Sequence, residues 1–94
     1  MTWGDYAAAK VVIEDEVTGS ARDGSGRIVL VRLSDWSVRW IKSHTDQNFL
    51  EHSSFTLTER HLYFGEVPVQ SQLMLRVYRY DLASFDALPS SPGW

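Results

Sequence analysis

Short stretches in which apolar and polar side chains alternate constrain this chain more than any other feature. Successive side chains of a strand point to opposite faces, so an alternation of period two predicts a strand with one buried face. Trp36, Val38 and Trp40 alternate in this way, and we interpret them as an inward, core-forming face. Residues 27–33 are almost continuously apolar and rich in β-branched side chains, which is typical of a central strand covered on both faces. The predicted strands cover residues 10–17, 27–33, 36–42, 55–64 and 73–80. Residues 55–64 form either one long strand or two short ones, because residues 59–61 interrupt the apolar face.

The connections between these segments favour antiparallel pairing. Residues 18–26 are dense in Gly, Ser and Asp, the residues that tight turns require, and only Ser34 and Asp35 separate the next two strands. A parallel crossover needs a dozen or more residues, which these connections do not have. We therefore predict a mainly β fold, a small antiparallel β-sandwich or partly open barrel of five or six strands with one or two short helices. The alternative is an α+β fold, in which a helix covers one face of an antiparallel sheet.

Two segments outside the strands carry helical signals. Leu82, Phe85 and Leu88 recur at a spacing of three and predict about two turns of helix, which either caps its own sheet or docks on another chain. A second, shorter helix is predicted over 46–51, where Asp46 is a suitable N-cap. A length of 94 residues predicts one domain over residues 1–88, followed by a Pro, Ser and Gly tail over residues 89–94. We expect a partner to order the ring of Trp94.

Composition disfavours several classes of function. The chain has no cysteine, which excludes a disulfide framework, a thiolate nucleophile and a zinc site of the cysteine type. Twelve acidic residues against nine basic ones give a net charge of −3, which opposes binding to phosphate backbones. No apolar run approaches the roughly 20 residues of a membrane span. We expect a cytoplasmic protein with no cofactor and no membrane contact, and keep a single-stranded nucleic-acid-binding β-barrel as an alternative because aromatic residues and arginines are abundant.

Three histidines are the candidates for acid–base chemistry or metal binding. His44, His52 and His61 lie eight and nine residues apart, whereas two metal ligands on one helix face need a spacing near four. We therefore predict no metal ligands and no catalytic residues, and interpret these side chains as solvated. A small hydrolase using His44, His52 or His61 is the second alternative.

The abundance of Trp, Tyr and Arg favours protein–protein contact. These residue types dominate interaction hot spots because each buries a large area and retains a polar group. We predict a non-enzymatic interaction protein, either a small inhibitor or accessory factor, or a subunit of a larger assembly such as a viral particle. It would pair with a partner or with itself through an edge at 73–80, as a homo-oligomer or in a hetero-complex. The predicted partner-binding residues are Arg39, Trp40, Arg76, Tyr78, Arg79, Tyr80 and Trp94.

Overall fold

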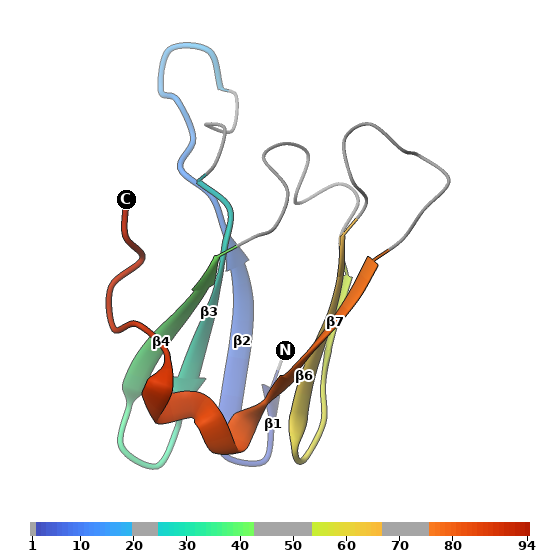
Figure 1. Cartoon of the computed structure of the whole chain (residues 1–94). Helices are drawn as coiled ribbons and strands as arrows, with labels where there is room; N and C mark the ends of the chain where they lie inside the picture. Colours follow the sequence, from blue (N-terminus) through green and yellow to red (C-terminus); the bar gives the residue numbers. More distant parts are fainter. Residues whose placement is uncertain (1, 20–24, 43–53, 67–75) are drawn as a thin grey trace.

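The computed structural model describes residues 2–19, 25–42, 54–66 and 76–94 and shows a mainly β chain (Figure 1). The strands within these ranges are β1 Thr2–Trp3, β2 Tyr6–Val11, β3 Arg27–Arg32, β4 Ser37–Lys42, β5 Ser54–Leu57, β6 His61–Glu66 and β7 Arg76–Asp81. A 3-10 helix, η1, follows over Leu82–Ala87. The predicted helix over 46–51 and the beginning of the predicted strand 73–80 lie outside the described residues.

The strands form two antiparallel sheets, ordered β1-β2-β3-β4 and β5-β6-β7. The sheets face each other, and η1 crosses from the end of β7 toward β4 at one end of the molecule (Figure 1). This arrangement is a small β-sandwich, so the predicted fold class is confirmed.

The register of the strands determines which side chains enter the core. In the four-stranded sheet Ile28 lies opposite Ile41, and Leu30 lies opposite Ala8. In the three-stranded sheet Leu62 lies opposite Leu57. Burying each large aliphatic or aromatic side chain contributes roughly 1.5 to 3 kcal/mol before entropy is counted. The core cluster consists of Ala8, Ile28, Leu30, Ile41, Leu57, Leu62, Phe64, Leu82 and Phe85.

Helix η1 closes one end of this core. The carboxylate of Asp81 accepts a hydrogen bond of 3.0 Å from the N–H of Ala83, which satisfies a donor of the first turn. Leu82 and Phe85 are buried, and Leu88 packs against the same core. A spacing of three matches the three residues per turn of a 3-10 helix, so one face collects these side chains. Of the two predicted roles of this segment, the structure shows the cap on its own chain.

The first predicted strand, 10–17, was placed too late in the chain, because the strand covers Tyr6–Val11. The three alanines of β2 show no alternation of apolar and polar side chains, although they form the strand. The acids and valines that follow do alternate, although they lie mostly outside it. Asp15 ends the extended backbone, because its carboxylate accepts hydrogen bonds from the N–H groups of Val17 and Thr18. Val17, the last residue of that predicted strand, is 93% exposed.

The sequence left open whether residues 55–64 form one strand or two, and the structure shows two strands joined by a tight turn at Thr58. The Thr58 N–H donates to the carbonyl oxygen of His61 at 2.8 Å, and the His61 N–H donates to the Thr58 hydroxyl at 3.1 Å. These bonds close the turn and leave Glu59 and Arg60 at its tip.

Candidate functional site

Trp36 does not belong to the core, contrary to the sequence-based interpretation. It lies in the turn before β4, its φ is +59°, and its side chain is 74% exposed. Val38 and Trp40 face outward, because Arg39 and Ile41 occupy the inward positions of β4. An inward arginine is tolerated because Arg39 lies at the helix-capped end of the sandwich, with its guanidinium 5.2 Å from the Phe85 ring and 3.8 Å from the Asp86 carboxylate.

The predicted partner-binding residues of β7 do not share one face. Tyr78 and Tyr80 point inward, where Tyr78 stacks on Phe64 at 5.2 Å and the Tyr80 hydroxyl donates to the carbonyl oxygen of Ser84. Arg79 is exposed on the outer face. Burial raises the pKa of Tyr80, and the nearby Asp81 carboxylate adds to this effect. The side chain of Arg76 lies outside the described part of the structure.

The predicted residues therefore fall on three different surfaces. Arg39 and the two β7 tyrosines lie between the sheets, and Arg79 lies outside the three-stranded sheet. Trp40 and Trp94 are the pair that the structure brings together, with ring centroids 5.7 Å apart in an edge-to-face arrangement. Both belong to the outer side of the four-stranded sheet.

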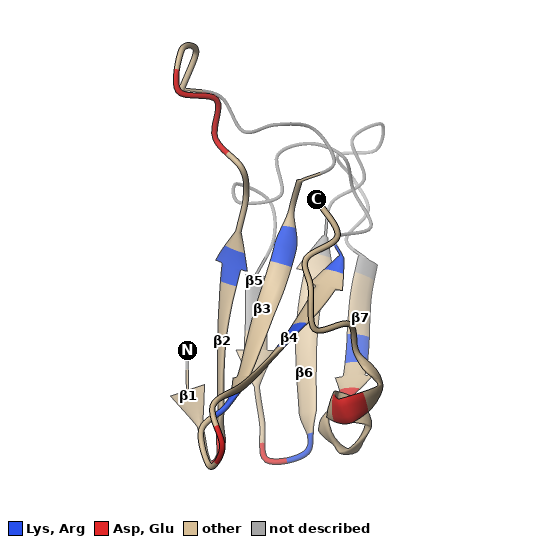
Figure 2. Cartoon of the chain, turned by 90° about the vertical axis from the view of Figure 1, so that its left-hand side faces the viewer, with Lys and Arg blue, Asp and Glu red and all other residues tan. Residues whose placement is uncertain are grey.

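That outer side carries two apolar rows that sequence reasoning did not assign to a site. Ala7, Val31 and Val38 are aligned across β2, β3 and β4, and Ala9, Val29 and Trp40 form the neighbouring row. Most of these side chains are half-buried, and Ala9 is exposed. Figure 2 views the molecule from this side, and the central parts of the strands are mostly free of charge. The almost unbroken apolar pattern of 27–33 was the sequence signal for this second apolar face.

The segment 89–94 lies against one end of this face. The Trp40 N–H donates to the carbonyl oxygen of Pro89 at 3.0 Å, at the edge of β4. The Arg27 Nε donates to the carbonyl oxygen of Pro92 at 2.7 Å. The Trp94 Nε1 donates to the carbonyl oxygen of Ser25 at 3.0 Å. Trp94 was predicted to need a partner for order, and here it is seated on its own chain.

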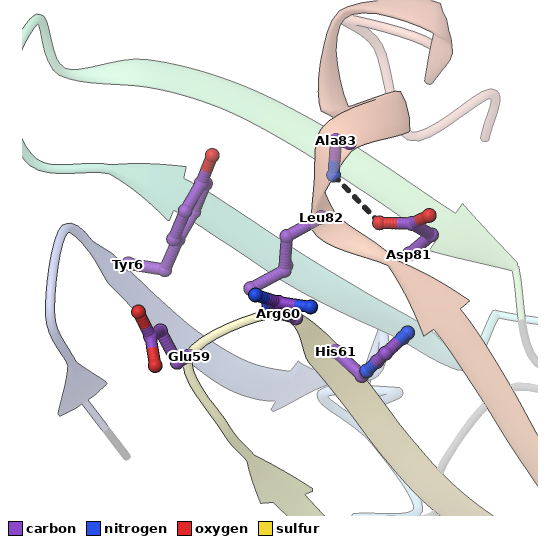
Figure 3. Close-up of a pocket in the computed structure, with 7 residues that line it drawn as sticks. All are labelled: Tyr6, Glu59, Arg60, His61, Asp81, Leu82 and Ala83. Atoms are coloured by element: carbon purple, nitrogen blue, oxygen red, sulfur yellow. Dashed lines mark hydrogen bonds between the residues drawn. The ribbon is translucent and has the colours of Figure 1, made fainter.

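A pocket of about 490 Å³ opens at the opposite end of the strands, beside the start of η1 (Figure 3). The Leu82 N–H donates to the carbonyl oxygen of Arg60, which joins η1 to the β5–β6 turn. The Asp81 carboxylate is directed to the Ala83 N–H as the helix cap, as the dashed line in Figure 3 shows. The pocket is lined by Tyr6, Glu59, Arg60, His61, Asp81, Leu82 and Ala83.

His61 is the one candidate histidine whose position is described. It lies on this pocket, with its ring 5.7 Å from that of Tyr63. His44 and His52 lie outside the described residues. Within the described ranges, no three side chains of His, Cys, Asp or Glu come together as a group that could hold a metal ion. The pocket thus collects a phenol, an imidazole, a guanidinium and two carboxylates at a solvent-exposed edge.

A charged cluster fixes the β3–β4 turn to η1 at the same end. Arg32 contacts the carboxylates of Asp35 at 2.8 Å and Asp86 at 3.2 Å, and its guanidinium lies 4.7 Å from the Phe85 ring centroid. Hydrogen bonding to Arg32 holds the pKa of Asp35 well below its usual range, and the same contacts raise the pKa of Arg32. The cluster is a structural clamp over Phe85.

No known protein family, curated protein or solved structure matches this chain. Among the described residues, no helix has the length and apolar character needed to cross a membrane.

Proposed function

We propose that this is a non-enzymatic protein–protein interaction protein of the cytoplasm, a subunit that assembles through the outer face of its four-stranded sheet. The observation that carries the proposal is the pair of apolar rows across β2, β3 and β4. A sheet whose outer face is solvated normally carries polar side chains there. Contiguous apolar surface on a small domain is typical of an interaction site.

A second copy of the chain is the occupant that this face favours. Val29, Val31 and Val38 carry no charge, so the central rows of two copies approach without repulsion, while Arg27 and Lys42 lie together at one end of the face. Sheets stack face to face about 10 Å apart, and a two-fold axis pairs a surface with itself. Pairing through the β7 edge remains the sequence-based alternative, since β7 is the last strand in the order of its sheet.

Matched lysine substitutions on the two outer faces test the proposal. Val31→Lys places a charge in the centre of the apolar rows, and Thr56→Lys places the same charge at an exposed outward position of β5. Sedimentation equilibrium over a wide concentration range should show self-association of the wild-type chain. We expect Val31→Lys to weaken it about 30-fold or more, as a hot-spot substitution of 2 kcal/mol or more would, and Thr56→Lys to leave it within about twofold.

Circular dichroism of both variants verifies that they remain folded. A wild-type chain that stays monomeric at every concentration would overturn the proposal. Self-association that survives Val31→Lys would also overturn it and would favour the β7 edge.

A further inference from the structure

The segment 89–94 occupies a built binding site on the outer side of β3 and β4. Arg27, the first residue of β3, is only 5% exposed although it faces outward, and Ser25, just before β3, is only 1% exposed. The Arg27 guanidinium lies 5.9 Å from the Trp94 ring centroid while its Nε donates to Pro92. A second guanidinium nitrogen donates to the carbonyl oxygen of Gly26, which fixes the orientation of the fork. The segment is thus held by buried, oriented groups.

The contacts define what this site recognises. Trp40 N–H and Arg27 Nε donate to backbone carbonyls of the segment, so they recognise a peptide backbone irrespective of its side chains. The Ser25 carbonyl accepts from the indole of Trp94, and Trp40 packs edge-to-face on it, so they select a tryptophan. Gly93 adopts φ +73°, which brings the tryptophan ring back onto the sheet and disfavours any residue with a side chain there. The recognised chemistry is a Pro-Gly-Trp peptide that turns at its glycine.

The segment is joined to the core by a short, defined connection. The Leu88 N–H donates to the carbonyl oxygen of Phe85, and Leu88 packs on the core cluster. The residues that follow are exposed except Pro92, and Trp94 itself remains 48% exposed. Six residues stretched out fully would span up to about 20 Å, which exceeds the spacing of about 10 Å between stacked sheets.

We propose that this site is a peptide-binding site that takes the 89–94 segment of a second copy, so that two assembled chains exchange their segments. This inference rests on the proposed function, because the outer faces must approach each other for the exchange to occur. The site and the apolar rows lie on the same side of the same sheet, so a second copy stacked on the apolar rows would also lie against the site. The segment bound in its own chain is then the form of an unpaired copy.

Binding of a synthetic peptide to the full chain tests the site directly. The probe is a dye-labelled peptide of residues 88–94, followed by fluorescence anisotropy. An attached segment competes at an effective concentration on the order of mM, so Trp94→Ala, which weakens this competitor, should bind the peptide about tenfold or more tightly than the wild-type chain. Trp94→Ala combined with Trp40→Ala should lose the binding. Trp94→Ala combined with Trp36→Ala is the matched control and should retain it.

The same peptide with alanine in place of its tryptophan should not bind. Circular dichroism verifies folding, and Trp94→Phe, which retains a ring but loses the indole donor, replaces Trp94→Ala if that variant unfolds. No saturable binding up to mM peptide, or equal binding with and without Trp40, would overturn the inference. Peptide binding retained in Val31→Lys, with a wild-type chain that never self-associates, would leave the peptide site standing and reject assembly and exchange.

Discussion

The two sheets are alike on their inner faces and differ on their outer faces. Inner positions of both sheets supply the same aliphatic and aromatic core. The outer face of the three-stranded sheet carries Thr56, His61, Tyr63, Val77, Arg79 and Asp81. The outer face of the four-stranded sheet carries alanines, valines and Trp40 in its two central rows. One outer face therefore has the composition of a solvated surface, and the other has the composition of a surface that is covered.

Because of this difference, inward and outward side chains should contribute to different properties of the molecule. Under the proposed function, we expect an inward side chain to contribute to the free energy of unfolding and an outward apolar side chain of the four-stranded sheet to contribute mainly to association. Substitutions on the two kinds of position should therefore change different measured quantities.

Phe85→Ala should give the largest loss of stability. Phe85 is 1% exposed, contacts the Tyr6 ring at 5.7 Å and lies beneath the guanidinium groups of Arg32 and Arg39. Removing a buried phenyl ring costs about 3 to 5 kcal/mol. Urea unfolding monitored by circular dichroism measures this loss, and both sheets should unfold in one transition. A loss below about 1 kcal/mol would contradict the shared core.

Substitutions at two neighbouring positions of β7 test which face of this strand points into the core. Tyr78→Ala removes a ring stacked on Phe64 and should cost about 2 kcal/mol, since this ring is only partly buried. Val77→Ala removes a side chain that is 65% exposed and should change stability by less than about 0.5 kcal/mol. Chemical denaturation of the two variants in parallel provides the comparison. The reverse order of effects would show that the outer face of β7 has been assigned wrongly.

Trp36→Gly should stabilise the chain modestly. A non-glycine residue in the left-handed region is strained by roughly 1 to 2 kcal/mol, and Trp36 has φ +59° with a largely exposed ring. Glycine relieves the strain but gains entropy in the unfolded chain, so we expect a net gain of about 0.5 to 1 kcal/mol. Thermal unfolding measures it. A clear loss of stability would mean that the Trp36 ring makes a contact whose stabilising free energy exceeds the backbone strain.

Lowering the pH should reduce the small contribution of the Arg32–Asp35 ion pair to the stability of the folded chain. The folded-state pKa of Asp35 is depressed by Arg32, so its contribution is complete above the unfolded pKa of about 3.9 and is lost as the pH falls through the lower folded value. The difference in Tm between the wild-type chain and Asp35→Asn should therefore be largest near neutral pH and shrink below about pH 4. A difference that stays constant down to pH 2 would reject this origin.

The fold class could be predicted from the sequence because strand periodicity and turn residues are local signals. The strand 27–33 and the helical spacing from Leu82 were recognisable for this reason. The first strand was misplaced because alanines in β2 have no contrast with their neighbours, while Asp15 ended the valine-rich stretch through a side-chain hydrogen bond.

The candidate surface was harder to predict from the sequence, because the register between strands determines which residues share a face. Arg39 and Trp40 are neighbours in sequence but lie on opposite sides of one sheet. The inward tyrosines of β7 were predicted to bind a partner, because a tyrosine is compatible with either face of a strand. The contacts of Trp94 with Ser25 and Trp40 join residues far apart in the chain, which no local pattern predicts.

Valine methyl groups on the two outer faces provide the most direct test of the central claim, that the outer face of the four-stranded sheet is the assembly surface. Methyl NMR spectra of the unmodified chain over a dilution series compare Val29, Val31 and Val38 with Val77, which lies on the other outer face. We expect concentration-dependent shifts at the first three and constant shifts at Val77. Shifts confined to Val77, or no change at any of the four, would contradict the account.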